Sequence, residues 1–234
     1  MEINVFLPCR AGSQRVKNKN TKAFGGHKNG LLEIKLKQLL ESKKINKIYL
    51  SSDDCAILAY AKELKNPKII THKRDSTLAS STTSTDSLIT HAKELMPSGE
   101  ILWTHVTSPF VKDYDKIILA YEKALKSGFD SLMSVYKLFC FLWDKSGSIN
   151  YNRALEKWPR TQTLKPLFEV NSAAFLANSE IYKSQNDRIG KNPYLYEMDK
   201  IESFDIDWEE DFVMGDLLYR SINGGGGGVK PISL

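Results

Sequence analysis

Three cations and a run of small residues directly follow an apolar segment at the N-terminus. The cations are Arg10, Arg15 and Lys19, and the small residues occupy positions 11–13. The apolar segment at 3–7 is typical of a strand that carries the chain to the carboxyl edge of a sheet. At such an edge the backbone N–H groups of small residues turn toward an anion, and the cations supply charge. The stretch therefore predicts a cradle for phosphate groups.

The same stretch lacks the two commonest nucleotide-binding signatures. It has no Gly-Lys-Ser/Thr ending, so it is not a Walker loop, and it has no G-x-G-x-x-G pattern, so it is not a dinucleotide fingerprint. The predicted phosphate site must therefore be of another kind.

The second feature that could take part in chemistry is a pair of carboxylates near the C-terminal end. We expect Asp205 and Asp207 to alternate along a strand, so that both side chains point to one face. Two such carboxylates repel each other unless a cation lies between them, and Mg²⁺ usually binds through one or two carboxylates together with substrate phosphates. The pair predicts a site for Mg²⁺, with Mn²⁺ as a substitute. For an isolated D-x-D pattern, the alternative is two unrelated acids at a solvated strand end.

The elements that must position these residues alternate between short β-rich runs and helical patterns. We expect strands at 3–7, 47–50, 69–71, 101–106, 131–136 and 168–177, and helices at 31–40, 52–64, 86–95, 113–127 and from about 211 to 219. This alternation is typical of βαβ units. It predicts an α/β fold with three layers, in which a mostly parallel sheet carries helices on both faces. Ser52 is the expected N-cap of the second helix.

Two segments depart from this alternation. Residues 139–167 contain two short aromatic runs, 139–143 and 149–151, which predict a β-hairpin that leaves the main sheet. The Ser/Thr-rich run at 80–87 resembles a linker, but we interpret it as the beginning of a helix because an apolar helical pattern follows it directly.

Length and composition indicate one globular domain. The chain has 234 residues and a hydrophobic content of 41%, which predicts a domain at 1–222 that includes the excursion, followed by a flexible Gly-rich tail at 223–234. The net charge of +5 is spread along the chain. Because no basic stripe is interleaved with aromatic residues, a nucleic-acid-binding module ranks last among the functions considered.

The cysteines and the hydropathy pattern indicate the cellular compartment of the protein. Cys9, Cys55 and Cys140 have no C-x-x-C spacing and are odd in number, which is typical of reduced thiols in a cytoplasmic protein. No apolar run approaches the length of a membrane span. We therefore expect a cytoplasmic protein without a membrane partner.

The spacing Arg10-x-x-Ser13-x-Arg15-x-x-x-Lys19-Asn20 resembles the N-terminal motif of the sugar-acid cytidylyltransferases, the CMP-N-acylneuraminate and CMP-Kdo synthetases. Further stretches follow in that family's order: Ser51-Ser52-Asp53, Arg74-x-x-x-Leu78-Ala79, Thr107-Ser108-Pro109, Arg160-x-Gln162, Asn171-Ser172-Ala173 and Asp205-Ile206-Asp207-x-Glu209-x-Asp211. The resemblance covers nearly the whole chain. It implies a nucleotidyltransferase fold of the Rossmann-like kind.

The resemblance also implies a reaction. The anomeric hydroxyl of a 2-keto sugar acid, such as N-acetylneuraminic, legionaminic or pseudaminic acid, would attack the α-phosphate of CTP and release pyrophosphate, giving a CMP-sugar for surface glycan biosynthesis. Arg10, Lys19 and Asp207 would be the catalytic residues, and Asp205 with Asp207 would hold Mg²⁺. The implied nucleotide-binding residues are Arg10, Ser13, Arg15 and Lys19 for the triphosphate, Asn20 for the ribose, and Arg74 with Thr85 for the cytosine.

The implied contacts to the sugar acid come from later in the chain. Arg160 and Gln162 would face the sugar acid, whose carboxylate suits the Arg160 guanidinium, and His105 lies where it would contact the sugar. Asn171 matches a residue that contacts sugar hydroxyls, although pairing with neighbouring backbone is an equal alternative. Residues 139–167 match an excursion that packs across a homodimer, and a surface flap is the alternative.

Four positions depart from the family pattern. His105 stands where a Gln is usual, Ser172 where a Gly is usual, Ser81 where an Asp is usual, and Gln14 where the acylneuraminate enzymes carry Lys. These departures bear on the identity of the sugar more than on nucleotidyl transfer. The alternatives are a non-catalytic nucleotide-binding homologue, a nucleotidyltransferase for a different sugar, and a glycosyltransferase that uses D-x-D to hold a nucleotide sugar.

Overall fold

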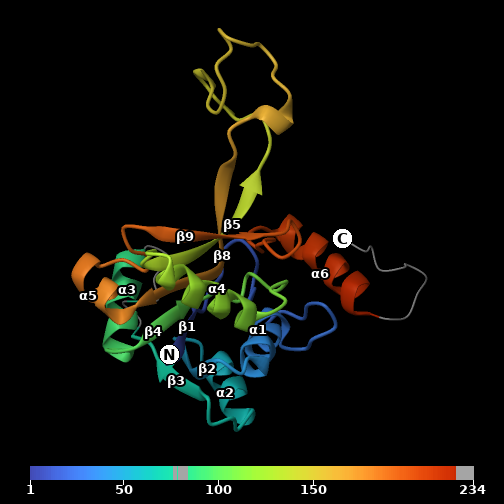
Figure 1. The fold of residues 1–234 in the computed structure, drawn as a ribbon. Helices are drawn as coiled ribbons and strands as arrows, with labels where there is room; N and C mark the ends of the chain where they lie inside the picture. Colours follow the sequence, from blue (N-terminus) through green and yellow to red (C-terminus); the bar gives the residue numbers. More distant parts are fainter. Residues whose placement is uncertain (76–77, 79–83, 225–234) are drawn as a thin grey trace.

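The computed structural model describes residues 1–75, 78 and 84–224. Figure 1 shows a twisted sheet flanked by helices, with an arm that rises away from it. The elements in chain order are β1 (Ile3–Cys9), α1 (Gly30–Glu41), β2 (Ile45–Ser52), α2 (Cys55–Glu63), β3 (Ile69–Lys73), α3 (Thr85–Leu95), β4 (Glu100–Trp103), α4 (Tyr114–Lys126), β5 (Ser131–Leu138), β6 (Trp143–Asp144), β7 (Gly147–Ser148), the 3₁₀ helix η2 (Thr161–Thr163), β8 (Leu167–Asn178), α5 (Ser179–Gln185), β9 (Pro193–Met198) and α6 (Glu209–Asn223).

The main sheet has seven strands in the order β3-β2-β1-β4-β8-β5-β9. Neighbouring strands are parallel except at β8, which runs antiparallel to both β4 and β5. Parallel neighbours require crossover connections, and the helices between the strands supply them. The predicted mostly parallel sheet is confirmed.

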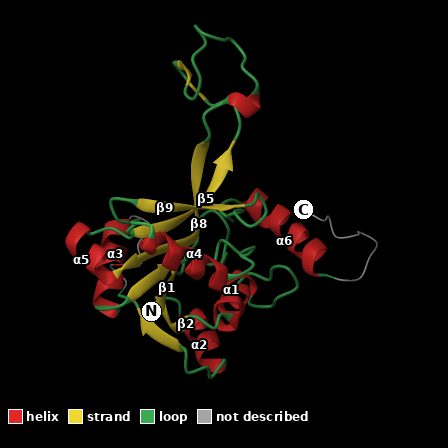
Figure 2. Ribbon diagram, viewed as in Figure 1, coloured by secondary structure: helices red, strands yellow, loops and turns green. Residues whose placement is uncertain are grey.

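Two apolar clusters on opposite faces of the sheet complete the layers. The larger contains buried residues of α1, α2, α4 and α6, for example Leu32, Ile57, Ile117 and Phe212. The smaller contains Ile89 of α3 and residues of α5 and β4. Helices lie on both sides of the strands in Figure 2. The predicted three-layer α/β fold is therefore confirmed, and each layer is held by burial of one helix face.

The strand β1 lies between β2 and β4 and is buried along its whole length. Because β1, β2 and β4 run in the same direction, their carboxyl ends meet at one edge of the sheet. The loops after β1, β2 and β4 begin with Arg10, Asp53 and Thr104. This topology gathers three separate stretches of sequence beside one another.

The excursion is a ribbon with an arm at its end. Strands β5 and β8 remain paired beyond the sheet, from Val135 opposite Val170 to Leu138 opposite Leu167. Residues 139–166, which we call the arm, rise from the end of this ribbon (Figure 1).

The predicted hairpin that leaves the main sheet is confirmed, because β6 and β7 pair antiparallel, but its strands are shorter than the predicted runs at 139–143 and 149–151. The arm contains only the two-residue strands β6 and β7. Side chains replace the expected ladder: Asp144 Oδ1 accepts from the backbone N of Ser146 and Gly147, and Asn150 bonds to the backbone of Leu142 and Cys140. Such Asx contacts compete with regular strand pairing.

Several element boundaries also differ from the prediction. Ser52 lies in β2, and α2 is capped instead by Asp54, whose carboxylate accepts from the backbone N of Ala56. Strand β4 ends at Trp103, before the predicted end at residue 106, although the backbone N of Thr104 still donates to the carbonyl oxygen of Phe6 in β1. Strand β9 and helix α5 were not predicted; β9 is an edge strand that begins at a proline and has no clear alternation.

Part of the Ser/Thr-rich run begins a helix, as predicted. Helix α3 starts at Thr85, and the side chain of Ser84 accepts from the backbone N of Ser87. Residues 80–83 of that run, with Ser81, lie outside the described residues, and so do Ala79 and the tail from residue 225 onward. None of the described helices is long and apolar enough to cross a membrane.

Candidate active site

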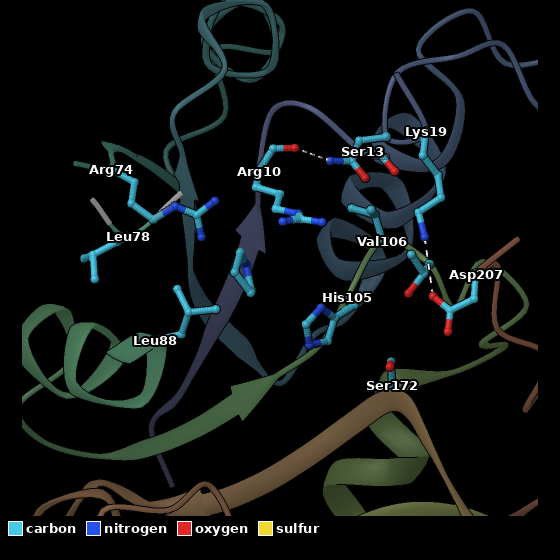
Figure 3. Close-up of a pocket in the computed structure, with 13 residues that line it drawn as sticks. Arg10, Ser13, Lys19, Arg74, Leu78, Leu88, His105, Val106, Ser172 and Asp207 are labelled. Carbon is cyan, nitrogen blue, oxygen red and sulfur yellow. Dashed lines mark hydrogen bonds and ion pairs between the residues drawn. The ribbon is translucent and has the colours of Figure 1, made fainter. Parts of the chain in front are cut away.

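A cavity of about 390 Å³, which we call the main cavity, opens at the carboxyl ends of β1 and β4 (Figure 3). Seven of the predicted site residues line it: Arg10, Ser13, Lys19, Asn20, Arg74, His105 and Asp207. The remaining lining residues are Pro8, Leu78, Leu88, Val106, Thr107 and Ser172. The fold therefore brings together residues that are far apart in the sequence, from the N-terminal loop to the segment before α6.

The loop at 10–20 is held in shape by its own side chains and by β2. Gly12 has a φ of +66°, a left-handed conformation that favours glycine. The backbone N of Ala11 donates to Asp53 Oδ1 at 2.9 Å. Asn20 Nδ2 donates to the carbonyl oxygen of Arg10 at 3.0 Å, which closes the loop on itself. The loop is thus preorganised as a concave, cation-rich surface, while the predicted ribose contact of Asn20 stays a prediction.

The cations of the loop meet Asp207 at one side of the main cavity. Lys19 Nζ donates to the carbonyl oxygen of Ile206 at 2.7 Å and lies 3.5 Å from Asp207 Oδ1. Arg15 Nη1 lies 3.4 Å from the same oxygen, and the Arg15 guanidinium stacks 4.4 Å from the ring centroid of Trp208. Burial lowers the pKa of Lys19 below its ordinary value, against the opposing pull of the two aspartates. Arg15 itself is not among the residues that line the main cavity.

The prediction that Asp205 and Asp207 lie on a strand was wrong. Residues 204–207 form no strand; they lead from a turn into α6, and their backbone is anchored where the N of Ile206 donates to the carbonyl oxygen of Thr107 at 2.8 Å. Asp211 Oδ2 then accepts from the backbone N of Asp207 and of Trp208, which starts the helix.

Both carboxylates nevertheless reach one space. Asp205 and Asp207 line a second hollow of about 390 Å³, which we call the side cavity, and Asp207 borders both cavities. The described residues contain no cluster of three or more His, Cys, Asp or Glu side chains suited to a metal ion. Two carboxylates without further protein ligands fit Mg²⁺, which completes its coordination with phosphate oxygens and water.

Arg74 forms the opposite side of the main cavity. Its side chain is only 2% exposed, and its Nη2 lies 3.4 Å from Asp53 Oδ1. Its Nε is buried without a hydrogen-bond partner among the described residues, which is uncommon for a buried polar group. Thr85, predicted to share the cytosine with Arg74, is exposed at the first turn of α3 and does not line the cavity.

His105 extends from the end of β4 into the main cavity (Figure 3). Its Nε2 lies 2.8 Å from Nε1 of Trp103, the buried indole two residues earlier. Burial lowers the pKa of His105 to about 3, and the nearby cations Arg188, Lys35 and Lys19 act in the same direction. His105 is therefore a neutral imidazole at ordinary pH.

The structure does not gather the remaining predicted sugar contacts in the main cavity. Asn171 lines the side cavity, but its Oδ1 accepts from Ser134 Oγ at 2.6 Å and from the backbone N of Ala173 at 3.1 Å, which is the backbone-pairing alternative. Arg160 and Gln162 lie in the arm, at η2, and line neither cavity of their own chain. Their substrate roles stay predictions.

Sequence reasoning missed Lys35, a fully buried lysine beneath the site. Its Nζ donates to the carbonyl oxygen of Ser108 at 2.7 Å and to Tyr114 Oη at 2.5 Å. Burial lowers the pKa of Lys35 to about 7. Its position inside the apolar face formed by Leu31 and Leu39 was the available signal, because a lysine there has no route to solvent. It holds the Thr107-Ser108-Pro109 turn against α1.

Comparison with known proteins places these residues in a family context. A family model described as Cytidylyltransferase matches residues 5–221. An N-acylneuraminate cytidylyltransferase of Streptococcus agalactiae is 27% identical over 230 residues, covering 92% of this chain and 53% of the relative. The chain thus spans about half the length of such relatives. The post-translational flagellin modification protein B of Campylobacter coli is 23% identical and covers 95% of this chain and 97% of its own.

Solved structures share the fold. A 4-diphosphocytidyl-2C-methyl-D-erythritol synthase of Anaerococcus prevotii superposes with a TM-score of 0.66 at 16% identity, covering 93% of this chain and 95% of that one. A CMP:2-keto-3-deoxy-manno-octonic acid synthetase complexed with CTP has a TM-score of 0.66 at 10% identity, covering 94% and 99%. At such identities the likeness concerns the architecture, which agrees with the nucleotidyltransferase-like fold expected from the sequence.

Proposed function

The chain belongs to the cytidylyltransferase family, and we propose that it transfers CMP from CTP to a 2-keto sugar acid of the nonulosonic class, with release of pyrophosphate. The observation that carries this proposal is the convergence of Arg10, Lys19, Arg74 and Asp207 on the main cavity. Relatives named N-acylneuraminate cytidylyltransferase support the acylneuraminate class of acceptor. The CMP-sugar would serve surface glycan biosynthesis.

The proposed reaction needs alignment and charge neutralisation rather than covalent catalysis. The anomeric hydroxyl oxygen forms a bond to the α-phosphorus of CTP, the bond from that phosphorus to the bridging oxygen breaks, pyrophosphate leaves, and the hydroxyl proton is released. Arg10 and Lys19 line the space where the triphosphate would lie and would offset its negative charge. The rigid loop closed by Asn20 means that little reorganisation is required when the nucleotide binds.

We propose Mg²⁺ as the cofactor, held by Asp205 and Asp207. Both carboxylates line the side cavity, and Asp207 also faces the main cavity. When bound, the ion would shield the phosphate oxygens and favour departure of pyrophosphate. Lys19 and Arg15, which both pair with Asp207, hold that carboxylate at the boundary between the two cavities.

We further propose a homodimer in which the arm of one chain reaches the other chain's site. The arm exposes large apolar side chains, among them Trp143, Leu155 and Trp158, which soluble monomers rarely cluster. Arg160 and Gln162 lie in the same arm and away from the cavities of their own chain. We therefore propose that Arg160 and Gln162 contact the substrate in the site of a second copy of the chain.

The proposal is tested by incubating the purified protein with Mg²⁺, each of the four nucleoside triphosphates and a panel of 2-keto sugar acids, and by measuring pyrophosphate release. Release that requires CTP and one sugar acid supports the proposal and identifies the acceptor. CTP binding by calorimetry without release for any acid favours the non-catalytic homologue. Release with a different nucleotide, or no CTP binding, overturns the assignment.

A further inference from the structure

The hydrogen bond between Trp103 and His105 determines which proton the imidazole carries. An indole Nε1–H is a donor only, so its partner must offer a lone pair. Because the partner is His105 Nε2 at 2.8 Å, that nitrogen is unprotonated. A neutral imidazole without a proton on Nε2 carries it on Nδ1. The geometry therefore makes His105 a neutral Nδ1–H tautomer.

The surroundings of Trp103 make this hydrogen bond rigid. Trp103 is fully buried and packs edge-to-face on Phe6, with ring centroids 4.7 Å apart. The Arg188 guanidinium lies 5.2 Å from the Trp103 ring centroid and 3.7 Å from that of Phe175. A cation over the indole face fixes its plane, so the Nε1–H direction is set before any ligand arrives.

The charged groups around His105 favour its neutral form. Arg188, Lys35 and Lys19 oppose its protonation, and Asp207 alone among the contributing groups favours it. The backbone N of His105 donates to the carbonyl oxygen of Ser172 in β8 at 3.2 Å, which holds the main chain of His105 in place beyond the end of β4. Within the described residues, Nδ1 has no hydrogen-bond partner, and the side chain lines the main cavity.

We propose that Trp103 is a positioning residue which locks His105 as the Nδ1–H tautomer, so that His105 offers the second substrate one hydrogen-bond donor and no acceptor. This inference rests on the proposed function for the identity of that substrate. The matching ligand group is an acceptor without a proton, such as a carboxylate or a carbonyl oxygen. A Gln, usual at this position in the family that the sequence resembles, offers both a donor and an acceptor. The presence of His105 in place of Gln therefore restricts the ligand groups that this position can bind to hydrogen-bond acceptors.

The tautomer is read directly by ¹⁵N NMR of the histidine rings in the free protein. The chain has four histidines, and His105→Gln identifies the His105 signals by their loss. We expect a protonated Nδ1 and an unprotonated Nε2 in the wild-type protein. In Trp103→Phe the donor is lost, and both nitrogens should shift toward values averaged over the two tautomers. The matched control Trp143→Phe removes an indole from the arm and should leave the signals unchanged.

Two NMR results would overturn the proposal: an Nε2–H tautomer in the wild-type protein, or an unchanged His105 tautomer in folded Trp103→Phe. The wild-type spectrum decides the first point even if the variant does not fold. With the sugar acid that supports turnover, Trp103→Phe should raise its KM about two- to fivefold, because only part of the imidazole population would then carry its proton on Nδ1, and should leave the KM for CTP unchanged. An equal rise in both would indicate a structural role only. Failure of turnover in the wild-type protein would refute the proposed function, not the tautomer.

Discussion

The Lys19 ammonium lies 3.5 Å from the Asp207 carboxylate, so the phosphate cradle and the acidic segment are joined by direct contact. Lys19 also donates to the carbonyl oxygen of Ile206, and Lys22 pairs with Glu209 at 2.8 Å. The N-terminal loop therefore positions the start of α6 before any ligand binds. Cations for the triphosphate and oxygens for a metal ion reach the same space through this contact.

The double substitution Asp205→Asn/Asp207→Asn should remove the two negative charges proposed to bind Mg²⁺ while leaving the fold intact. We expect the rate of pyrophosphate release to fall at least about a hundredfold, because phosphate charge would lose its strongest counter-ion. The side chain of Asp207 is 54% exposed, so its ion pairs contribute at most about 1 kcal/mol to the free energy of unfolding.

The control for this pair is Glu210→Gln, which removes an exposed acid from the first turn of the same helix. Its turnover should match the wild-type value, and urea unfolding should report similar stability for all three proteins. Unchanged turnover in the double variant would contradict the proposal that Asp205 and Asp207 bind Mg²⁺.

Asp53→Asn should weaken CTP binding. Asp53 Oδ1 accepts from the backbone N of Ala11 and faces buried Arg74, so loss of its charge leaves Arg74 without its ion-pair partner and loosens the loop. We expect the KM for CTP to rise roughly tenfold, in line with a hydrogen bond to a charged group. Glu63→Gln, an exposed acid at the end of α2, should leave the KM unchanged. Equal KM values for the two variants would contradict the role given to Asp53.

Lys35→Met should change how stability depends on pH. Burial lowers the pKa of Lys35 from its ordinary value of 10.5 to about 7. Between these values the unfolded chain binds a proton that the folded chain does not, so the contribution of Lys35 to the free energy of unfolding is least favourable below pH 7 and improves as the pH rises. The stability of the wild type relative to Lys35→Met should therefore increase by up to about 1.4 kcal/mol per pH unit over this range.

The measurement is urea unfolding of both proteins at several pH values between about 7 and 10, a range set by the two pKa values. Lys37→Met is the matched control, because Lys37 is exposed on the same helix. Its stability difference from the wild type should be nearly flat with pH. A flat difference for Lys35→Met as well would mean that the Lys35 ammonium is not destabilised by burial.

Asp211→Ala should destabilise the start of α6. The Asp211 carboxylate accepts from the backbone N of both Asp207 and Trp208, and loss of a cap typically costs about 1 kcal/mol. Glu210→Ala shares the first turn but makes no such contact and should cost less. Chemical denaturation compares the two; a cost for Asp211→Ala no greater than that for Glu210→Ala would count against the cap.

Mixing two inactive variants tests whether the arm acts across a dimer. Arg160→Ala and Asp207→Asn should each be strongly impaired. If Arg160 of one chain serves the site of its partner, one of the two sites in a mixed dimer carries both native residues. Random exchange makes about half of all dimers mixed, so about a quarter of wild-type activity should return. Recovery of none of the activity, in a mixture shown by sedimentation to exchange subunits, would place Arg160 outside the shared site.

Much of the scaffold was predictable because it depends on local patterns. The alternation of β-rich runs and helical periodicity predicted the three-layer α/β fold, and the spacing from Arg10 to Lys19 marked the loop that now lines the main cavity. Local patterns placed the hairpin in the arm but overestimated the length of its strands, because Asp144 and Asn150 bind the backbone there in place of regular strand pairing. They failed at Asp205 and Asp207, whose alternation resembled a strand although no neighbouring strand was present to pair with.

The sequence by itself determined which chemical groups this protein has and the order in which strands and helices present them. Residue type and short-range spacing are sufficient for that, since turn chemistry and hydrophobic periodicity act over a few residues. Only the tertiary structure decided that Lys35 is buried beneath the turn at 107–109, that Trp103 donates to His105, and that Arg160 and Gln162 of the arm line neither cavity of their own chain. Those contacts follow from strand order, register and burial, which depend on residues distant along the chain.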